Sequence, residues 1–323
     1  MAQVSPTQRR SGSGSRLDNC FLAASAKANE EARISWLPPR QCILTFGMKR
    51  VLTGLILIPC VLALVFLPSR LQWVFMLATA GVAALAGWEF LSMAERGGAR
   101  PPRVAVLLAI LLLFAGNFQW PDQSMVIFGM LSLGLLIYCT FRSSIELVMP
   151  DAVTATFCLL YVGLTMVTLP ILREQTNGPS LVAFLFCVVW GGDIAALYVG
   201  RTWGRHKFAP KLSPNKTWEG ALASVAGSLL VAGGLIALAQ QLEKWNSAVL
   251  SYPEDMSYWL GLAVLINVAA QVGDLVESAL KRSADVKDSG SLLPGHGGVL
   301  DRIDALLLAA PVLWYAQVIH QRF

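Results

Sequence analysis

Long apolar runs recur between residues 51 and 320, and they limit the possible folds of this chain more than any other feature of its sequence. About 20 apolar residues in a helix are enough to cross the hydrocarbon core of a bilayer. With 55% hydrophobic and 14% charged residues, the composition is also not that of a soluble globular protein. The sequence therefore predicts an all-α, polytopic membrane protein.

The apolar runs predict about nine transmembrane helices, at residues 51–67, 71–93, 104–120, 125–141, 152–172, 180–200, 219–241, 257–280 and 304–320. Lys and Arg are enriched in cytoplasmic connections, so they indicate the orientation. With the amino terminus in the cytoplasm, thirteen of these cations fall in cytoplasmic connections and four fall on the other side. We therefore expect a cytoplasmic amino terminus. Glu89 is interpreted as an interfacial residue near the end of the second span.

Residues 1–47 differ from the rest of the chain, because they are rich in Ser, Arg, Ala and Gln and hold no apolar run long enough for a signal sequence. Met48 and two cations then lead directly into the first apolar run, as at a natural amino terminus. We interpret residues 1–47 as a disordered extension and residues 48–323 as the membrane domain. A helix near residues 21–34 is the alternative.

A polar stretch at residues 278–304 lies between the last two apolar runs, and it carries four basic residues, four acidic residues, one histidine and four glycines. Charges so close to a bilayer usually have a function. Cations neutralise phosphate oxygens, and closely spaced Asp residues bind Mg²⁺ beside substrate phosphates. Glycine-rich backbone can approach an anion closely. The stretch predicts a metal-and-phosphate site at the membrane surface.

The eighth predicted span has a polar face, formed at steps of three and four residues by Asn267, Gln271, Asp274, Ser278 and Lys281. Hydrogen bonds between helices would explain its two amides. They explain Asp274 poorly, because a carboxylate at that depth needs a cation. Asp301 and Asp304 share a face at the start of the last span, although acidic residues also suit a helix amino terminus. If these two spans pack together, the three carboxylates can converge on one or two Mg²⁺ ions.

A second polar segment covers residues 190–220. Asp193 lies in the sixth span beside two glycines, which permit close helix packing. Asn215 or Thr217 can cap the seventh span, and a helix amino terminus near Lys211 and Lys216 suits a phosphate. A loop that only fixes topology is the alternative.

The sequence narrows the class of protein further. It contains neither a nucleophile elbow nor a Walker P-loop, so metal-assisted phosphoryl chemistry fits better than acyl transfer. No basic and aromatic residues interleave as in nucleic-acid-binding proteins. A transporter with Asp193 and Asp274 as ion ligands is a competing hypothesis. It is disfavoured because the polar residues gather after residue 190, whereas many transporters have paired halves.

Residues 278–304 read S-x-L-K-R-x-x-x-x-K-D-x-G-x-x-L-P-x-H-G-G-V-x-D-R-I-D, which resembles the phosphatidate cytidylyltransferase (CDP-diacylglycerol synthase) signature at every defined position. The segment that ends in S-P-N-K-T-W-E-G is similar to a second motif of that family, and the resemblance extends from Met48 to the end of the chain. The full signature argues against a CTP-dependent polyprenol or phytol kinase. The D-G-x-x-A-R motif of CDP-alcohol phosphatidyltransferases is absent from the sequence.

The resemblance implies a multi-pass, homodimeric enzyme of the bacterial inner membrane, with its active site on the cytoplasmic side. Such an enzyme converts CTP and phosphatidate to CDP-diacylglycerol and pyrophosphate. The resemblance also implies Mg²⁺ at Asp274, Asp301 and Asp304, with a monovalent cation such as K⁺ alongside. Further catalytic candidates are Lys281, Arg282, Lys287, Asp288, His296 and Arg302. Candidates for substrate binding are Asp193, Arg201, Lys211, Ser213, Asn215, Lys216, Thr217, Glu219, Gly297 and Gly298.

Overall fold

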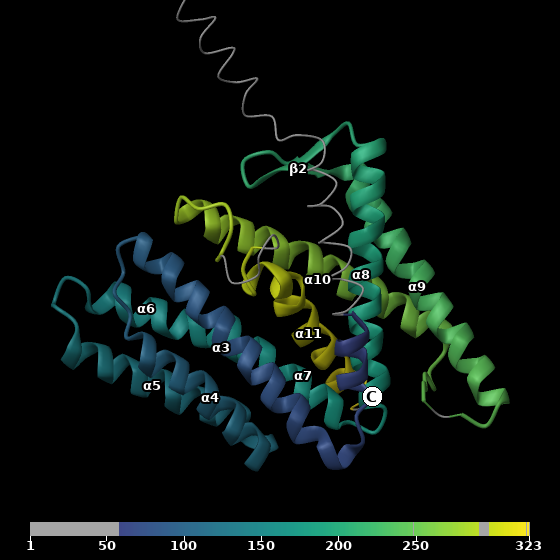
Figure 1. Ribbon diagram of the computed structural model, residues 1–323, viewed down its shortest axis with the longest axis horizontal. Helices are drawn as coiled ribbons and strands as arrows, with labels where there is room; N and C mark the ends of the chain where they lie inside the picture. The colour runs from purple at the N-terminus through teal and green to yellow at the C-terminus, as the bar shows by residue number, and fades with distance from the viewer. Residues whose placement is uncertain (1–57, 248, 291–296, 321, 323) are drawn as a thin grey trace, which may run out of the picture. The chain divides into compact units, whose positions relative to one another are not determined.

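The computed structural model describes residues 58–247, 249–290, 297–320 and 322, and this part of the chain consists of helices and one small hairpin (Figure 1). The first half comprises η1 (Ser69–Leu71), α3 (Gln72–Arg96), α4 (Arg103–Gln119), η2 (Pro121–Gln123), α5 (Ser124–Arg142), α6 (Val148–Cys158), the π-helical turn η3 (Leu159–Leu164) and α7 (Thr165–Glu174). The second half comprises α8 (Gly178–Thr202), β1 (Lys207–Ala209), β2 (Ser213–Thr217), α9 (Trp218–Lys244), α10 (Met256–Ser283) and α11 (Leu300–His320).

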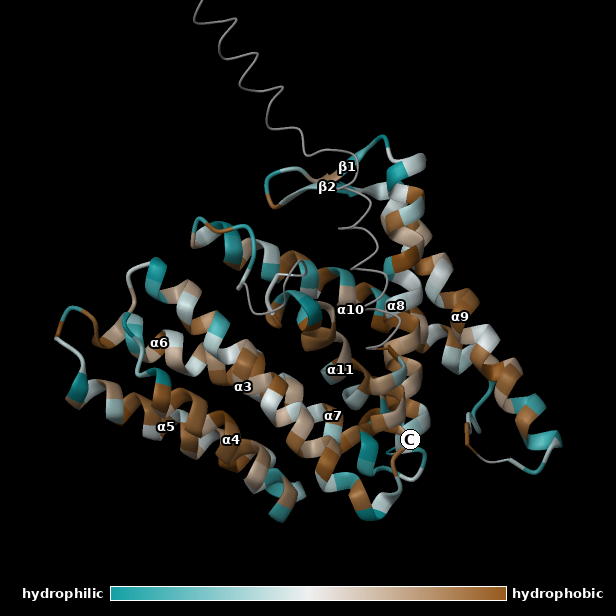
Figure 2. Cartoon of the chain, in the orientation of Figure 1, coloured by the Kyte–Doolittle hydropathy of each residue, from teal (hydrophilic) through white to brown (hydrophobic). Residues whose placement is uncertain are grey.

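Seven helical segments of the described residues are long and apolar enough to cross a membrane, and α4 is a shorter apolar helix. Together they correspond to the predicted spans from residue 71 onward, with ends that differ by up to four residues. Figure 2 shows their predominantly hydrophobic colouring. The protein is thus an all-α, polytopic membrane protein. The total of nine spans and the orientation stay predictions. The extension and residues 51–57 of the first predicted span lie outside the described residues.

Small residues allow α8 and α9 to pack closely, as the sequence predicted for the glycines beside Asp193. A Cβ atom added to Gly227 would lie 2.5 Å from Ala195 Cβ and 2.9 Å from the Gly191 carbonyl oxygen. In a membrane, where lipid competes for apolar contacts, such close backbone approach is a main source of helix association.

A buried polar cluster joins α10 to α9. Asn267, only 1% exposed, donates from Nδ2 to the hydroxyl oxygens of Ser224 and Ser228, both at 2.8 Å. Gln271 Nε2 donates to Asn267 Oδ1 at 2.6 Å and to the Ala221 carbonyl oxygen at 3.3 Å. Hydrogen bonds between helices are therefore confirmed as the explanation for these two amides.

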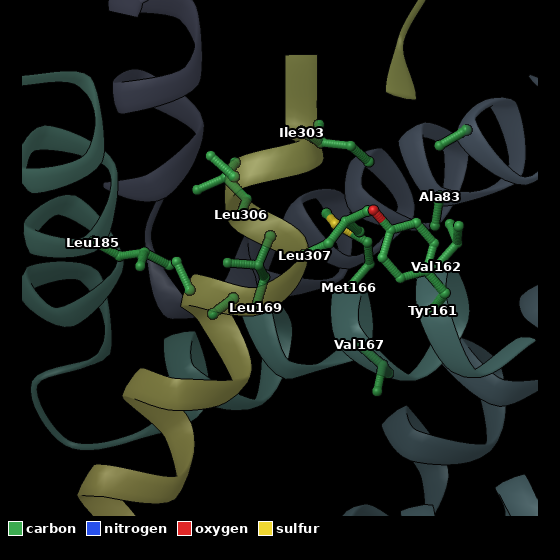
Figure 3. Packing of buried hydrophobic residues seen from close by; sticks show 14 of the residues in the cluster. Ala83, Tyr161, Val162, Met166, Val167, Leu169, Leu185, Ile303, Leu306 and Leu307 are labelled. Atoms are coloured by element: carbon green, nitrogen blue, oxygen red, sulfur yellow. The ribbon is translucent and has the colours of Figure 1, made fainter. Parts of the chain in front are cut away.

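An apolar core lies where α7 and α11 meet (Figure 3). Met166 and Leu169 of α7 pack there with Leu307 of α11 and Leu185 of α8, and each is at most 2% exposed. Close packing of such buried side chains fixes the helices relative to one another. It holds the start of α11, which carries Asp301 and Asp304, close to α10.

A single membrane segment contains α6, η3 and α7, and it is interrupted by the π turn. After that turn in the chain, Arg173 lies near the end of α7. It is 5% exposed and donates to two backbone carbonyl oxygens of the residues before η1. Its Nε lies 3.0 Å from the Val65 oxygen, and a terminal guanidinium nitrogen lies 2.5 Å from the Leu67 oxygen. The cation thus anchors the segment that leads into α3.

Gly192 on α8 faces the polar cluster, so Gly192→Ala is expected to destabilise the protein. An added Cβ would lie 2.7 Å from Ser228 Oγ and 2.9 Å from Ser224 Oγ. Overpacking of this kind costs about 1–3 kcal/mol, which should lower the midpoint of thermal unfolding in detergent. Gly234→Ala on α9 is the matched control, because nothing lies within 4 Å of its added Cβ. Equal midpoints for the two variants would contradict this account.

Candidate functional site

The connection between α8 and α9 is folded rather than irregular. Its strands β1 and β2 pair antiparallel, with Lys207 opposite Thr217, and the hairpin leads directly into α9. Thr217 caps that helix, because its hydroxyl oxygen accepts a hydrogen bond from the Gly220 backbone N–H at 3.2 Å. Of the two predicted capping residues, the structure thus selects Thr217. The Glu219 carboxylate secures the other end of the connection by accepting the His206 backbone N–H at 3.2 Å.

A cavity of about 720 Å³ lies between this hairpin and helices α8, α9 and α10. Its lining combines residues that the sequence singled out in two separate segments. Those residues are Asp193, Arg201, Asn215, Lys216, Thr217 and Asp274. Lys207 and Gln271 also line it. Cations, carboxylates and the capped amino terminus of α9 therefore meet around one space, which suits an anionic ligand.

Opposite charges are paired inside this cavity. Lys216 Nζ lies 2.6 Å from Asp274 Oδ2, and the two side chains are 25% and 40% exposed. Asp274 also interacts electrostatically with Asp193 on α8 and with Asp304 on α11. Three carboxylates from three helices thus share one electrostatic environment, and Lys216 neutralises part of their charge.

Asp301 belongs to a second, adjoining group of polar contacts. Its Oδ1 accepts from Lys281 Nζ at 2.7 Å, while its Oδ2 accepts from the backbone N–H groups of Ser289 at 3.0 Å and Gly298 at 2.8 Å. Lys281 also forms an ion pair with Glu277, which is fully buried. Asp301 therefore joins Ser289, which follows α10, to Gly298, which precedes α11.

Glu89 of α3 closes this group from the other half of the chain. Its Oε2 accepts the Leu300 backbone N–H at 2.8 Å, and the Ser289 hydroxyl lies between this oxygen, at 3.1 Å, and Asp301 Oδ2, at 3.0 Å. Its side chain is 4% exposed, so it is buried within the protein, and its position near the membrane interface stays a prediction. A Cβ at Gly298 would overlap this carboxylate, which explains why a glycine stands there.

The predicted magnesium ligands divide between these two groups. Asp274 and Asp304 interact electrostatically, whereas the oxygens of Asp301 accept hydrogen bonds from Lys281, Ser289 and Gly298. Within the described ranges, no three His, Cys, Asp or Glu side chains are grouped as they would be around a bound metal ion. Carboxylate oxygens are nevertheless the donors that Mg²⁺ prefers, so the donor set fits this ion chemically. The three-Asp set stays a prediction.

The remaining predicted residues surround the two groups or lie outside them. Arg282 Nε donates to the Leu212 carbonyl oxygen at 3.4 Å, which joins the end of α10 to the hairpin. Gly297 has a φ of 79°, a left-handed conformation that favours glycine. Lys211, Lys287, Asp288 and Arg302 are exposed and Ser213 is half-buried. His296 lies outside the described residues.

Sequence reasoning missed the structural parts played by Glu277 and Ser289, and it missed the hydrogen bonds of Glu89. Glu277 had a local signal, because it lies three residues after Asp274 and four before Lys281, on the same side of α10. Glu89 was visible as a lone charge in an apolar run, which in a membrane helix indicates a function. Ser289 had no distinguishing signal within its polar segment.

Comparison with known proteins shows which family this chain resembles. A model of the cytidylyltransferase family matches residues 48–320. The chain is 34% identical over 284 residues to a phosphatidate cytidylyltransferase of Pseudomonas aeruginosa, an alignment that covers 83% of this chain and 97% of that protein.

Two further relatives carry the same name. The Bacillus subtilis protein is 30% identical over 272 residues, covering 83% of this chain and 96% of the relative. The Brucella suis protein is 45% identical over 161 residues, covering 48% of this chain and 54% of the relative. The chain thus matches about half the length of this Brucella relative.

Proposed function

This chain belongs to the cytidylyltransferase family, and from that premise we propose that it transfers a cytidylyl group from CTP to phosphatidate. The products are CDP-diacylglycerol and pyrophosphate, so the protein is a nucleotidyltransferase of phospholipid biosynthesis. The observation that carries this proposal is the cavity at the α8–α9 hairpin, where Lys216 and the capped start of α9 face Asp193 and Asp274. A polar space in a membrane protein suits the reaction of a water-soluble nucleotide with a lipid phosphate.

The transfer itself is a substitution at phosphorus. A phosphate oxygen of phosphatidate attacks the α-phosphorus of CTP, a new P–O bond forms, and the bond from the α-phosphorus to the bridging oxygen breaks as pyrophosphate leaves. No covalent enzyme intermediate is needed. The chain contributes by positioning the two phosphates and by stabilising their charge.

We assign the phosphate-binding role to the cations around the cavity. Arg201, Lys207 and Lys216 line it, and the backbone N–H groups at the start of α9 add a partial positive charge. Lys216 has an ion-pair partner in Asp274, so a triphosphate competes with that carboxylate for the ammonium group. Lys281, Arg282, Lys287 and Arg302 are proposed to counter the remaining charge of the two substrates.

We propose Asp274, Asp301 and Asp304 as the magnesium ligands, with K⁺ alongside. Their oxygen chemistry and the electrostatic interaction between Asp274 and Asp304 support this assignment. When bound, Mg²⁺ would neutralise phosphate charge and assist the departure of pyrophosphate. The chain's own part is to hold these carboxylates on α10 and α11, whose packing is fixed by the core below them.

We further propose that the protein lies in the inner membrane of a bacterium, with this site on the cytoplasmic side, and that it acts as a homodimer. The clustering of Lys and Arg in the connections that form the cavity supports the orientation, because such connections stay in the cytoplasm.

Product analysis tests the proposed function. The purified protein in detergent is incubated with phosphatidate, CTP labelled in the cytosine ring, and Mg²⁺. The expected result is a lipid that carries the label, and pyrophosphate in equal amount. Omission of Mg²⁺ together with EDTA should stop the reaction. Phosphorylation of a polyprenol from CTP, with no labelled lipid formed from phosphatidate, would instead identify a kinase and overturn the proposal.

Deletion of residues 2–47 is expected to leave the specific activity within about twofold of the full chain. The reason is that both polar segments of the site, and the family match, lie after residue 47. The measurement is the same cytidylyl transfer assay, normalised to the protein that elutes as a single peak in gel filtration. A loss of activity in properly folded protein would give the extension a function.

A further inference from the structure

A second polar cavity, of about 730 Å³, lies at the connection between α3 and α4 and the end of α5. It is lined by three arginines, Arg100, Arg103 and Arg142, together with Glu95 and Tyr138. It shares no lining residue with the cavity at the α8–α9 hairpin. The proposed reaction therefore gives these arginines no role.

One of the three arginines is held in place by the protein. Arg103 donates from Nε to Glu95 Oε1 at 2.5 Å, and it forms an ion pair with the same carboxylate. Its guanidinium group also lies 4.7 Å from the centre of the Trp88 ring. The Glu95 carboxylate is thus paired with Arg103, and among the described residues it forms no ion pair with the other two arginines.

The other two arginines differ from Arg103 in their side-chain contacts. Within the part of the chain that the structure describes, the side chains of Arg100 and Arg142 make no hydrogen bond or ion pair, and both residues are exposed. The position of Arg100 is nevertheless fixed, because its backbone N–H donates to Asp151 Oδ1 at 2.6 Å. Two guanidinium groups at one cavity suit a phosphate, which accepts paired hydrogen bonds from each.

An apolar groove adjoins this cavity. A hollow of about 490 Å³ on α5 is lined by Gly134, Ile137, Tyr138, Phe141 and Arg142, so it shares Tyr138 and Arg142 with the polar cavity. Ile137 and Phe141 are 58% and 87% exposed. In a membrane-spanning helix, these exposed apolar side chains suit contact with hydrocarbon. A cationic cavity that opens onto such a groove matches a molecule with an anionic head and an apolar tail.

We propose that the cavity and the groove together bind one anionic phospholipid, at a site separate from the one for the reacting substrates. The phosphate lies between Arg100 and Arg142, and an acyl chain follows α5 past Gly134. Arginines that only fix topology would account for the charge, but not for a cavity continuous with an apolar groove. This inference does not depend on the proposed activity.

Lipid binding to the purified full chain tests the inference, with dioleoyl phosphatidylglycerol as the anionic probe and dioleoyl phosphatidylcholine as the neutral one. The double variant Arg100→Gln/Arg142→Gln is expected to bind phosphatidylglycerol at least about tenfold more weakly than the wild type, as counted by native mass spectrometry. The matched control is Arg70→Gln/Arg322→Gln, which removes two exposed arginines outside the cavity and should bind as the wild type does.

A second variant separates a lipid from a free phosphate. Gly134→Trp adds a large side chain in the groove, where nothing lies within 4 Å of an added Cβ, so the helix itself should tolerate it. It is expected to weaken the binding of phosphatidylglycerol while leaving the weak binding of glycerol 3-phosphate unchanged. Wild-type lipid binding by the folded arginine variant, or by the folded Gly134→Trp variant, would overturn the proposal.

Discussion

Asp301→Asn is expected to lower the rate of cytidylyl transfer by at least about 100-fold, while the protein stays folded and extractable in detergent. Both carboxylate oxygens of Asp301 accept hydrogen bonds. Oδ1 accepts from Lys281, and Oδ2 accepts from the backbone N–H groups of Ser289 and Gly298. An amide replaces one acceptor with a donor, so at least one of these N–H groups faces another donor. The contacts of residue 301 with Lys281, or with Ser289 and Gly298, are then weakened, and the proposed metal site loses one charge.

Asp285→Asn is the matched control for this prediction. Asp285 lies in the same polar segment but is exposed, and its φ of 53° is a left-handed conformation that Asn also adopts readily. Its rate should be unchanged. The measurement is the turnover number with saturating CTP and phosphatidate, after gel filtration has shown that both variants are folded. A wild-type rate for Asp301→Asn would remove Asp301 from the proposed site.

Glu89→Ala is expected to lower turnover by at least about tenfold, and Glu89→Gln to restore part of it. The Ala variant leaves the buried Leu300 N–H without its acceptor, at about 1–3 kcal/mol, while the Ser289 hydroxyl keeps Asp301 Oδ2 at 3.0 Å. The Gln variant keeps one acceptor oxygen for the Leu300 N–H. Glu89 contacts Leu300, the neighbour of Asp301, and Ser289, which hydrogen-bonds to Asp301, so it is a positioning residue.

The test of this role compares the two Glu89 variants with Ser92→Ala on the same helix. Ser92 Oγ donates only within α3, to the Trp88 carbonyl oxygen at 2.8 Å, so its removal should not change turnover. A role in stability alone would lower the midpoint of thermal unfolding and leave the turnover of folded protein unchanged. That outcome, or equal turnover for the Ala and Gln variants, would contradict the assignment.

The helices could be predicted from the sequence because each apolar run carries its own signal. The hairpin could not, because Lys207–Ala209 and Ser213–Thr217 are too short and too polar to show the alternation of a half-buried strand. The cavity could be predicted only in part from the sequence. The motifs named Asp193, Lys216 and Asp274, but the pairing of the last two depends on how α9 and α10 pack.

The side-chain partners of Asp301 could not be predicted from the sequence, for a different reason. Residues three apart on a helix point in directions about 60° apart, so Asp301 and Asp304 share a face in the sequence pattern and yet contact different neighbours. Asp301 contacts Lys281, while Asp304 interacts with Asp274. Glu89 contacts a residue 200 positions away in the chain, and no local pattern encodes such a contact.

The π turn between α6 and α7 has a consequence for how this span can vary. A π turn holds one more residue than a regular α-helical turn, so α7 is rotated by about 100° from where an uninterrupted helix would place it. With this offset, Arg173 lies where it donates to the carbonyl oxygens of Val65 and Leu67. Loss of one residue between Leu159 and Leu164 would keep the hydrophobicity and almost the length of the span. It would nonetheless rotate the guanidinium group away from both acceptors. The chain segment that leads into α3 would then lose both of these hydrogen bonds.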